Sequence, residues 1–328
     1  MNITYKEEYL HEHGFAEYFE NELIPLLEKV ERHRKATLKQ FLFIGSLCIL
    51  ACIIIPLGVV QLFDDYELIF VSFIFCAIVS GLILLHIRKS FKNVAITKVN
   101  EILVKFFGEF NYKRDYHISE DILDDVEFIL PDYDRIYCED YIHGKYENNK
   151  IEFCEARIEE EYEDSDGDSH YKTVFKGIFV ILTFNRNFSG KTFIIKDKGK
   201  ILNFFKKAST SLTRIELENK EFDKHYEVYS TNQIETQSIL STEFQKQIIQ
   251  LAKSFHCESI NCCLYQNKAF FAIPINRNLF ESISLFQSAY DTSRFKKFLQ
   301  DFYLVLTISD KISEKLFNET QNVSGQIE

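Results

Sequence analysis

The densest set of possible cation ligands in the chain is the acidic stretch EEEYEDSDGDSH at residues 159–170, which contains seven acidic residues and no lysine or arginine. A helix–loop–helix calcium site needs oxygen ligands at loop positions 1, 3 and 5, glycine at position 6 and a bidentate glutamate at position 12. Counted from Asp164, position 6 is a serine and position 12 a phenylalanine. We therefore predict an exposed hairpin tip in which Gly167 takes a positive φ. The alternative is weak cation binding by the carboxylates of Asp164, Asp166 and Asp168.

A second group of reactive side chains lies in the segment HCESINCC, with His256, Cys257, Cys262 and Cys263. Zinc sites are usually built from two pairs of closely spaced ligands, and this segment offers no second pair. Neighbouring residues of a strand point to opposite faces, so Cys262 and Cys263 would not share a site. Buried reduced thiols are the favoured interpretation. A nucleophile pair of Cys257 and His256 is the alternative that stays open.

Motifs of the main enzyme classes do not occur in the sequence. There is no glycine-rich phosphate loop, no Gly-x-Ser-x-Gly and no His-Glu-x-x-His. The net charge of −11 argues against nucleic acid as a partner, because nucleic acid requires a concentrated basic surface. The eight cysteines lack the spacing of a disulfide framework, which favours a reducing compartment. We predict no cofactor and no metal ion.

Two uncharged runs decide the class of the protein. Residues 41–60 and 68–87 are each 20 residues long without a formally charged side chain. A helix of this length extends about 30 Å, which matches the hydrocarbon core of a bilayer. Core helices of soluble proteins show a polar face, and these runs do not. A cleaved signal peptide would begin nearer the N-terminus and end at a small-residue site. We predict membrane spans at 41–63 and 68–87.

Charged residues beside the spans predict the orientation of this hairpin. Basic residues precede the first span and follow the second, whereas the connecting segment QLFDDYE is acidic. Basic flanks remain on the cytoplasmic side. We therefore predict a multi-pass membrane protein with both termini in the cytoplasm. The basic residues are Lys29, Arg32, Arg34, Lys35, Lys39, Arg88, Lys89, Lys92 and Lys98.

Hydrophobic periodicity predicts an α+β protein in which amphipathic helices flank the transmembrane hairpin. An N-terminal amphipathic cytoplasmic helix is expected in residues 1–40 and a juxtamembrane helical connector in 88–130. A cytoplasmic domain of mostly antiparallel sheet backed by helices follows at 131–317, before a polar tail at 318–328.

Within this domain, ENNK and QNK are expected to turn two hairpins, and residues 170–185 and 190–197 to form consecutive strands of an antiparallel meander. A helix over 242–256 is expected to begin with a capping box of Thr242 and Gln245. The last helix is expected at about 291–316.

Two segments resemble the bacterial two-span membrane-protein family catalogued as domain of unknown function 3137. They are VFKGIFVILTFNRNFSGKTFIIKD and EFDKHYEVYSTNQIETQSILS, and the likeness extends over roughly residues 90–300. The resemblance implies a protein of the bacterial inner membrane with a membrane-anchored cytoplasmic domain of unassigned activity, without catalytic residues to carry over. Asn232 stands where the family often has aspartate, which puts an acid–base role at that element in doubt. The matching residues are Phe175, Lys176, Gly177, Phe184, Asn185, Phe188, Gly190, Lys191, Thr192, Phe222, Tyr226, Glu227, Val228, Tyr229, Gln233, Glu235, Ile239 and Leu240.

Three functions compete on this evidence. The first is a membrane-anchored binding or scaffold module whose partner is a protein or a second copy of the chain. The second is a membrane-tethered, hydrolase-like enzyme that would use His256, Cys257, Glu227 or Glu235. The third is a lipid-headgroup-binding module. Its basic candidates lie in FFKKASTSLTR and are Lys206, Lys207 and Arg214.

Overall fold

A computed structural model describes residues 14–63, 66–146, 149–185, 187–196, 212–217 and 219–324, with side chains described up to Ser309 in the last helix. The described chain forms two compact units. The helical unit contains residues up to 106 together with 281–297, and the sheet unit contains 107–280 together with the residues from 298 onward.

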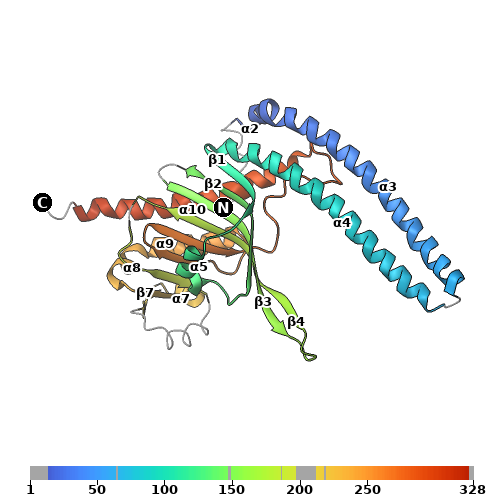
Figure 1. Ribbon diagram of the computed structural model, residues 1–328. Coiled ribbons are helices and arrows are strands. Elements are labelled where there is room, and N and C mark those ends of the chain that lie inside the picture. Colours follow the sequence, from blue (N-terminus) through green and yellow to red (C-terminus); the bar gives the residue numbers. More distant parts are fainter. Residues whose placement is uncertain are drawn as a thin grey trace. The chain divides into compact units, whose positions relative to one another are not determined.

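The helical unit consists of two long antiparallel helices (Figure 1). The first begins as α2 (Phe15–Tyr18), widens into a π-helical turn, η1 (Phe19–Leu23), and continues as α3 (Ile24–Phe63). The widened turn lies directly before Pro25, whose nitrogen has no hydrogen to donate to the preceding turn. The second helix is α4 (Leu68–Leu103), which tightens into the 3-10 segment η2 (Val104–Phe107).

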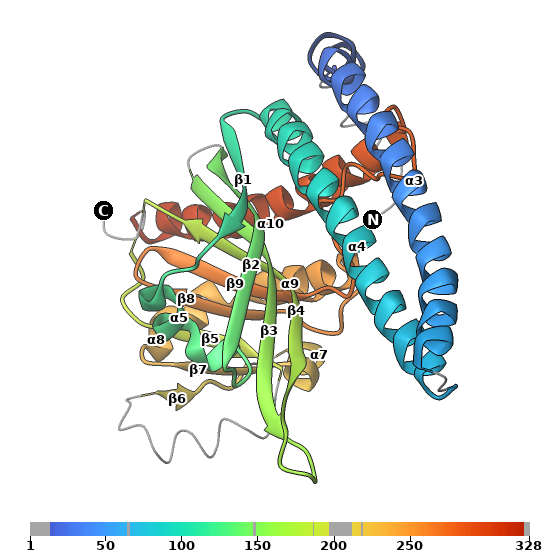
Figure 2. The ribbon, with the colours of Figure 1, turned by 45° about the vertical axis from the view of Figure 1, so that its right-hand side comes forward.

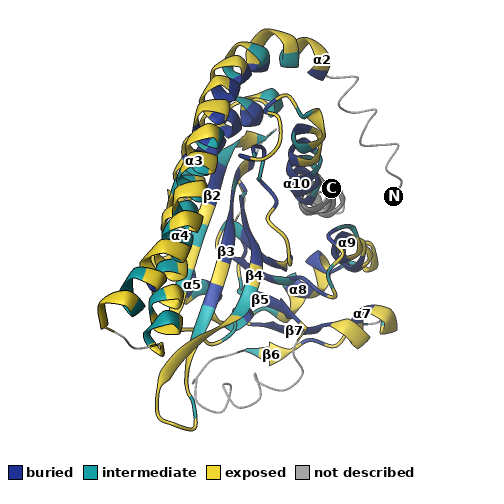
Figure 3. Ribbon diagram, turned by 90° about the vertical axis from the view of Figure 1, so that its right-hand side faces the viewer, coloured by how far each residue is buried: buried dark blue, intermediate teal, exposed yellow. Residues whose placement is uncertain are grey.

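Both long helices are apolar enough and long enough to cross a membrane. Their most apolar windows have mean hydropathies of 2.7 and 2.9, and only 6% and 0% of those windows are buried by the rest of the described chain. Figure 3 shows the same stretches of α3 and α4 as largely exposed. A core helix of a soluble protein would be covered, so the exposure fits membrane association and agrees with the two predicted spans.

The sheet unit is built on one nine-stranded sheet in which every pairing is antiparallel. Its strand order is β1-β2-β3-β4-β9-β8-β5-β7-β6. The strands are β1 (Phe110–Tyr116), β2 (Arg135–Tyr146), β3 (Asn149–Glu163), β4 (Ser169–Thr183), β5 (Thr192–Ile195), β6 (Thr213–Arg214), β7 (Glu227–Ser230), β8 (Asn261–Tyr265) and β9 (Lys268–Pro274). The predicted α+β class is confirmed.

Helices lie on both faces of the sheet (Figure 2). One face packs α5 (Glu120–Val126) and η3 (Glu127–Ile129) against inward-facing residues that include Phe179, Phe193 and Phe270. On the other face, Phe302 of α10 (Thr292–Ser324) contacts Phe153 of β3, with ring centroids 5.3 Å apart. The other helices among the described residues of this unit are α7 (Lys220–His225), α8 (Gln233–Ile239) and α9 (Thr242–Ser254). Aromatic side chains on both faces account for much of this core.

The meander expected from residues 170–185 and 190–197 is wrong. Strands β4 and β5 are not neighbours, because the β8–β9 hairpin lies between them. The chain crosses the tip of that hairpin, where the Phe184 N–H donates to the carbonyl of Asn267 at 2.8 Å. The short link between the two segments predicted adjacent strands. Instead, the β8–β9 hairpin, from much later in the sequence, lies between them.

Three local features differ from the expected elements. Residues 88–130, expected as a helical connector, also contain a strand, since Gly108 adopts a φ of 116° and β1 begins at Phe110. The N-cap of α9 is Ser241 rather than Thr242, because the Ser241 hydroxyl accepts the Phe244 N–H at 3.4 Å. Helix α10 continues to Ser324, beyond the expected end.

The hairpin of β3 and β4 extends beyond its neighbours in the sheet (Figures 1 and 2). The first residue of β2 pairs with Glu159, and the last residue of β9 pairs with Gly177. The outer residues, from Glu160 to Lys172, therefore pair only with each other among the described strands. We call residues 160–172 the arm.

We expect Gly177→Ala to destabilise the sheet unit by about 1–3 kcal/mol, the usual cost of forcing atoms into a packed site. A Cβ at Gly177 would lie 2.0 Å from the carbonyl oxygen of Ile273 on the paired strand β9. Thermal unfolding of the full chain in detergent measures the change. Lys176→Ala, at an exposed position of the same strand, is the control, and equal melting temperatures for the two variants would contradict the expectation.

Candidate functional site

A β-bulge in strand β2 creates the most unusual backbone in the sheet. Glu139 pairs with Glu155 of β3 and Ile142 with Phe153, so two residues of β2 lie opposite one residue of β3. The extra residue is accommodated at Asp140, whose φ of 54° lies in the left-handed region. A bulge of this kind changes the direction in which side chains point. Here it leaves the Asp140 side chain buried.

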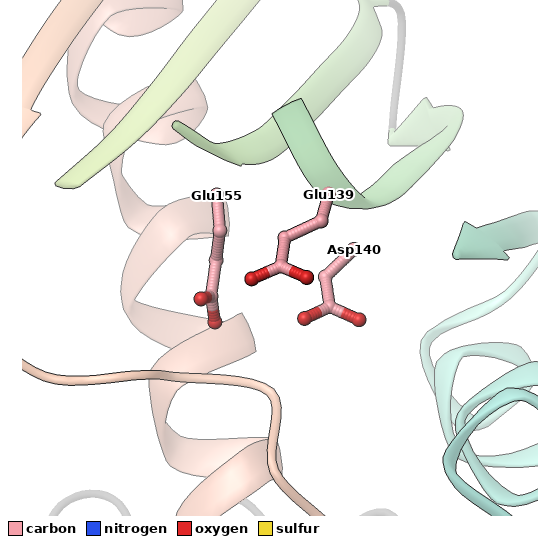
Figure 4. Close-up of side chains that lie close together, drawn as sticks. All are labelled: Glu139, Asp140 and Glu155. Atoms are coloured by element: carbon pink, nitrogen blue, oxygen red, sulfur yellow. The ribbon is translucent and has the colours of Figure 1, made fainter. Parts of the chain in front are cut away.

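Three carboxylates converge at this bulge (Figure 4). One carboxylate oxygen from each of Glu139, Asp140 and Glu155 lies within 4.8 Å of the other two. The cation that compensates them comes from β1: Arg114 Nη1 lies 2.5 Å from Asp140 Oδ1, and its Nη2 lies 2.9 Å from Glu139 Oε2. The Tyr112 hydroxyl, also on β1, donates to Asp140.

Glu155 is held from a different direction. Its Oε1 accepts the backbone N–H groups of Leu279 at 2.7 Å and Phe280 at 3.0 Å. Burial, reinforced by the negative charge of Asp140, raises the pKa of Glu155 to about 7, although these two N–H groups act in the opposite direction. Burial also raises the pKa of Asp140, against the opposing effects of Arg114 and Tyr112.

Carboxylate oxygens are the ligands that Ca²⁺ and Mg²⁺ prefer, so the donor types at the bulge suit such a cation. The arrangement does not fit one, because the guanidinium of Arg114 already bridges Asp140 and Glu139. Glu155 directs an oxygen to two peptide N–H groups. The cluster therefore acts as a protein-satisfied charge network that joins β1, β2, β3 and the residues after β9.

His256 and Cys257 form the end of helix α9. His256 has a φ of 54°, its N–H donates to the Lys253 carbonyl at 3.1 Å, and the Cys257 N–H donates to the Ala252 carbonyl at 3.0 Å. This is the hydrogen-bond pattern of a Schellman cap, with histidine in the position that glycine usually takes. Burial raises the pKa of the Cys257 thiol to about 11, which opposes formation of a nucleophilic thiolate.

Cys262 and Cys263 are both buried and reduced on strand β8. Burial raises the pKa of each thiol well above its ordinary value. Such thiols behave as small apolar side chains.

Glu227 and Glu235 hold separate partners. Glu227 is buried on β7, where it accepts the Tyr229 hydroxyl at 3.0 Å and lies 3.4 Å from the guanidinium of Arg214. Glu235 lies in the first turn of α8, and its two carboxylate oxygens accept the N–H groups of Ser189 and Gly190, each at 2.8 Å.

Asp164 organises the tip of the arm. Its Oδ1 accepts the N–H groups of Asp166 and Asp168, each at 3.0 Å, and its Oδ2 lies 2.8 Å from His170 Nε2. Hydrogen bonds from the Asp168 backbone and His170 lower the pKa of Asp164. Gly167 has a φ of 87°, as expected for the turn.

The basic lipid-binding candidates are mostly outside the part of the chain that the structure describes. Lys206 and Lys207 lie in the segment 197–211, which is not described. Arg214, on the edge strand β6, pairs with Glu227.

The residues that carry the family resemblance meet in space around the turn before β5. Gly190 approaches Asn232 so closely that a Cβ would lie 2.6 Å from the Asn232 Cβ. The Thr192 hydroxyl lies 2.8 Å from that of Thr236 and 3.1 Å from that of Ser230. Lys191 Nζ lies 2.9 Å from Asp125 of α5. Together with Glu235, these contacts fasten the turn to α8 and α5, which is a structural role for the motif.

The carboxylate cluster could not be identified from the sequence. Glu139 and Asp140 are consecutive, and consecutive residues of a regular strand point to opposite faces. Only the bulge brings them together with Glu155, and residues 139–142, where the register shifts, contain no glycine or proline to mark it. The sole signal was an acidic pair inside an otherwise apolar strand pattern.

We expect Glu155→Gln to flatten the pH dependence of stability. With a pKa of about 7 in the folded protein against 4.5 ordinarily, Glu155 binds its proton more tightly when folded. The free energy of unfolding should therefore fall as pH rises between these values and remain low above them, by up to about 3 kcal/mol. Glutamine stays neutral and can still accept both N–H groups, so the variant should be more stable than wild type near pH 8 and similar near pH 4.

Denaturant unfolding of the full chain in detergent across this pH range measures the effect. Glu243→Gln, on the exposed side of α9, is the matched control, since its side chain is largely exposed. Parallel stability curves for Glu155→Gln and wild type between about pH 5 and 7 would show that Glu155 is not the titrating group.

Comparison with known proteins supports one family. Residues 173–313 match the model of the family described as "Protein of unknown function (DUF3137)", which confirms the resemblance over this part of the chain. No curated protein sequence matches the chain. A solved structure, that of the mycobacterial trehalose monomycolate transport factor A, TtfA, is 12% identical, with 64% of this chain and 94% of that chain covered. Its TM-score of 0.33 is too low to carry an argument about fold or function.

Proposed function

We propose that this protein is a bacterial inner-membrane protein whose two-span hairpin anchors a cytoplasmic α+β domain, and that this domain binds another protein through the arm. The observation that carries the binding role is the extension of β3 and β4 past the neighbouring strands. The membrane anchor is supported by the uncovered apolar surfaces of α3 and α4.

Charge supports the proposed orientation. Lys35, Lys39, Arg88 and Lys89 are exposed next to the ends of the two apolar runs that face away from the connecting segment. Tyr66 and Glu67 lie at the opposite end. Under the positive-inside rule, the end with the basic residues is cytoplasmic.

The arm has the composition of a surface that recognises basic partners. It contains six carboxylates and a single lysine, and that lysine, Lys172, pairs with Glu160 at 2.9 Å. Tyr162 and Tyr171 are 44% and 37% exposed. Tyrosine is enriched in protein interfaces, and its ring accepts cations. Arg135 already lies over the Tyr171 ring, with its Cζ 3.5 Å from the centroid.

The partner that fits is therefore a protein segment rich in lysine and arginine. A second copy of this chain is one source of such a segment, because residues 29–39 are basic. A separate envelope protein is the other source, and an experiment in the native membrane distinguishes the two.

We expect a C-terminal green fluorescent protein to fluoresce on the full chain, and a C-terminal alkaline phosphatase to be inactive, because both would remain in the cytoplasm. The same phosphatase inserted next to Tyr66 should be active, because that loop would lie outside. Active phosphatase at the C-terminus would reject the proposed topology.

We expect a photo-crosslinking amino acid at Tyr162 of the full-length protein to capture a partner in the native membrane. The control position is Ile234, which is 84% exposed on α8 outside the arm. Reversal of arm charge by Glu161→Lys and Glu163→Lys should reduce capture several-fold, since like charges then face the basic partner. Mass spectrometry of the product separates a cross-linked copy of this chain from a different protein.

Equal capture at both positions, or capture that survives the charge reversal, would remove the arm as the binding surface. The hairpin topology would be unaffected by that outcome, because the reporter fusions test it separately.

A further inference from the structure

The segment ESISLFQSAYD, residues 281–291, belongs to the helical unit although it lies between β9 and α10 in the sequence. Four side chains of the long helices fix it in place. Glu31 Oε2 accepts the Ala289 N–H at 2.9 Å, and Arg34 Nη1 donates to the Leu285 carbonyl at 2.9 Å.

The third anchor is a buried polar pair. The Ser282 hydroxyl donates to Asn100 Oδ1 at 2.6 Å. Lys92 also forms an ion pair with Glu281. Polar groups of both α3 and α4 therefore hold the segment, and Leu285 and Ala289 are buried where α3 bonds to its backbone.

Phe286 is exposed. Its side chain follows the buried Leu285 in the sequence, yet it is 52% exposed. A single exposed apolar side chain is common on a protein surface, so the neighbours of Phe286 decide what its exposure means.

The position of Phe286 is defined by its two neighbours. Its ring lies edge-on to that of Phe41, with centroids 5.4 Å apart, and the guanidinium carbon of Arg88 lies 5.7 Å from its centroid. Phe41 is the first residue of the first uncharged run, and Arg88 is the first charged residue after the second run. The ring thus lies at the level where both helices change from charged to uncharged residues.

We propose that Phe286 inserts into the headgroup–acyl boundary of the bilayer, which makes residues 281–291 a third contact with the membrane beside the two spans. The inference rests on the proposed membrane position of α3 and α4. The exposed basic side chains of Lys39, Arg88 and Lys89 surround this level and suit anionic headgroups, while the ring enters the outermost acyl region.

The absence of tryptophan from the chain allows a direct depth measurement. Phe286→Trp in the full chain, reconstituted into phosphatidylcholine–phosphatidylglycerol vesicles, places one tryptophan at the proposed contact. Lipids brominated at a shallow or a deep acyl position quench tryptophan at the corresponding depth. We expect a blue-shifted emission and stronger quenching by the shallow bromines.

Three single-tryptophan variants serve as references. Phe41→Trp should report the same shallow depth. Phe75 lies on α4 within the second run and is 68% exposed, so Phe75→Trp should be quenched best by the deep bromines. Tyr162→Trp, in the arm, should be unquenched. Circular dichroism of each variant verifies the fold before the depth is interpreted.

Two results would overturn the inference in different ways. In the first, deep bromines quench Phe75→Trp, but Phe286→Trp is as unquenched as Tyr162→Trp. The hairpin would then be in the membrane and Phe286 in water. An unquenched Phe75→Trp would show that α4 does not enter the bilayer, and the proposed membrane anchor would fail with the inference.

Discussion

The requirement that apolar surface be kept from water determines most of this structure. Helices α3 and α4 present large side chains such as Phe43, Ile53 and Phe75 outward over most of their apolar length. At roughly 25 cal/mol for each Å² of apolar surface, exposing two such helices to water would cost far more than a domain's net stability. No described part of the chain covers them, which fits an apolar medium around them. The polar anchors of residues 281–291 lie outside the uncharged runs, where charged side chains can be hydrated or paired.

The sheet unit meets the same requirement by burying its apolar side chains on two faces, and it places a cluster of charged side chains where the backbone leaves the regular pattern. The bulge at Asp140 adds a residue to β2 and turns a carboxylate inward. A buried carboxylate is costly unless it is paired, and Arg114 with Tyr112 supplies the pairing from β1. Glu155 extends the network to the backbone after β9. Four separate segments thus share one electrostatic arrangement, whose charge state depends on a carboxyl group with a pKa near 7.

The family motif illustrates how residues that suggest chemistry can serve structure. Glu235 and Lys191 are charged groups of the kind that enzymes use, yet Glu235 caps two peptide N–H groups and Lys191 pairs with Asp125. Gly190 is required because Asn232 leaves no space for a side chain. His256 also has a structural role, because its left-handed backbone conformation ends α9. In each case the contact that the structure shows is a structural one.

The sequence by itself determined the two apolar helices, the α+β class and the pairing of β2 with β3 and of β8 with β9, because each depends on local periodicity and turn signals that neighbouring residues carry. The family likeness of residues 173–313 was also legible in short motifs. Tertiary structure alone decided that the β8–β9 hairpin separates β4 from β5, since strand order depends on pairings between distant residues. It also decided that Glu139, Asp140 and Glu155 converge. The bulge contains no glycine to mark it, and it breaks the alternation of side chains from which strand faces are predicted. The contact between Phe286 and Phe41 was also decided by the tertiary structure. These residues are some 245 positions apart in the chain and come together only through the packing of the folded helical unit.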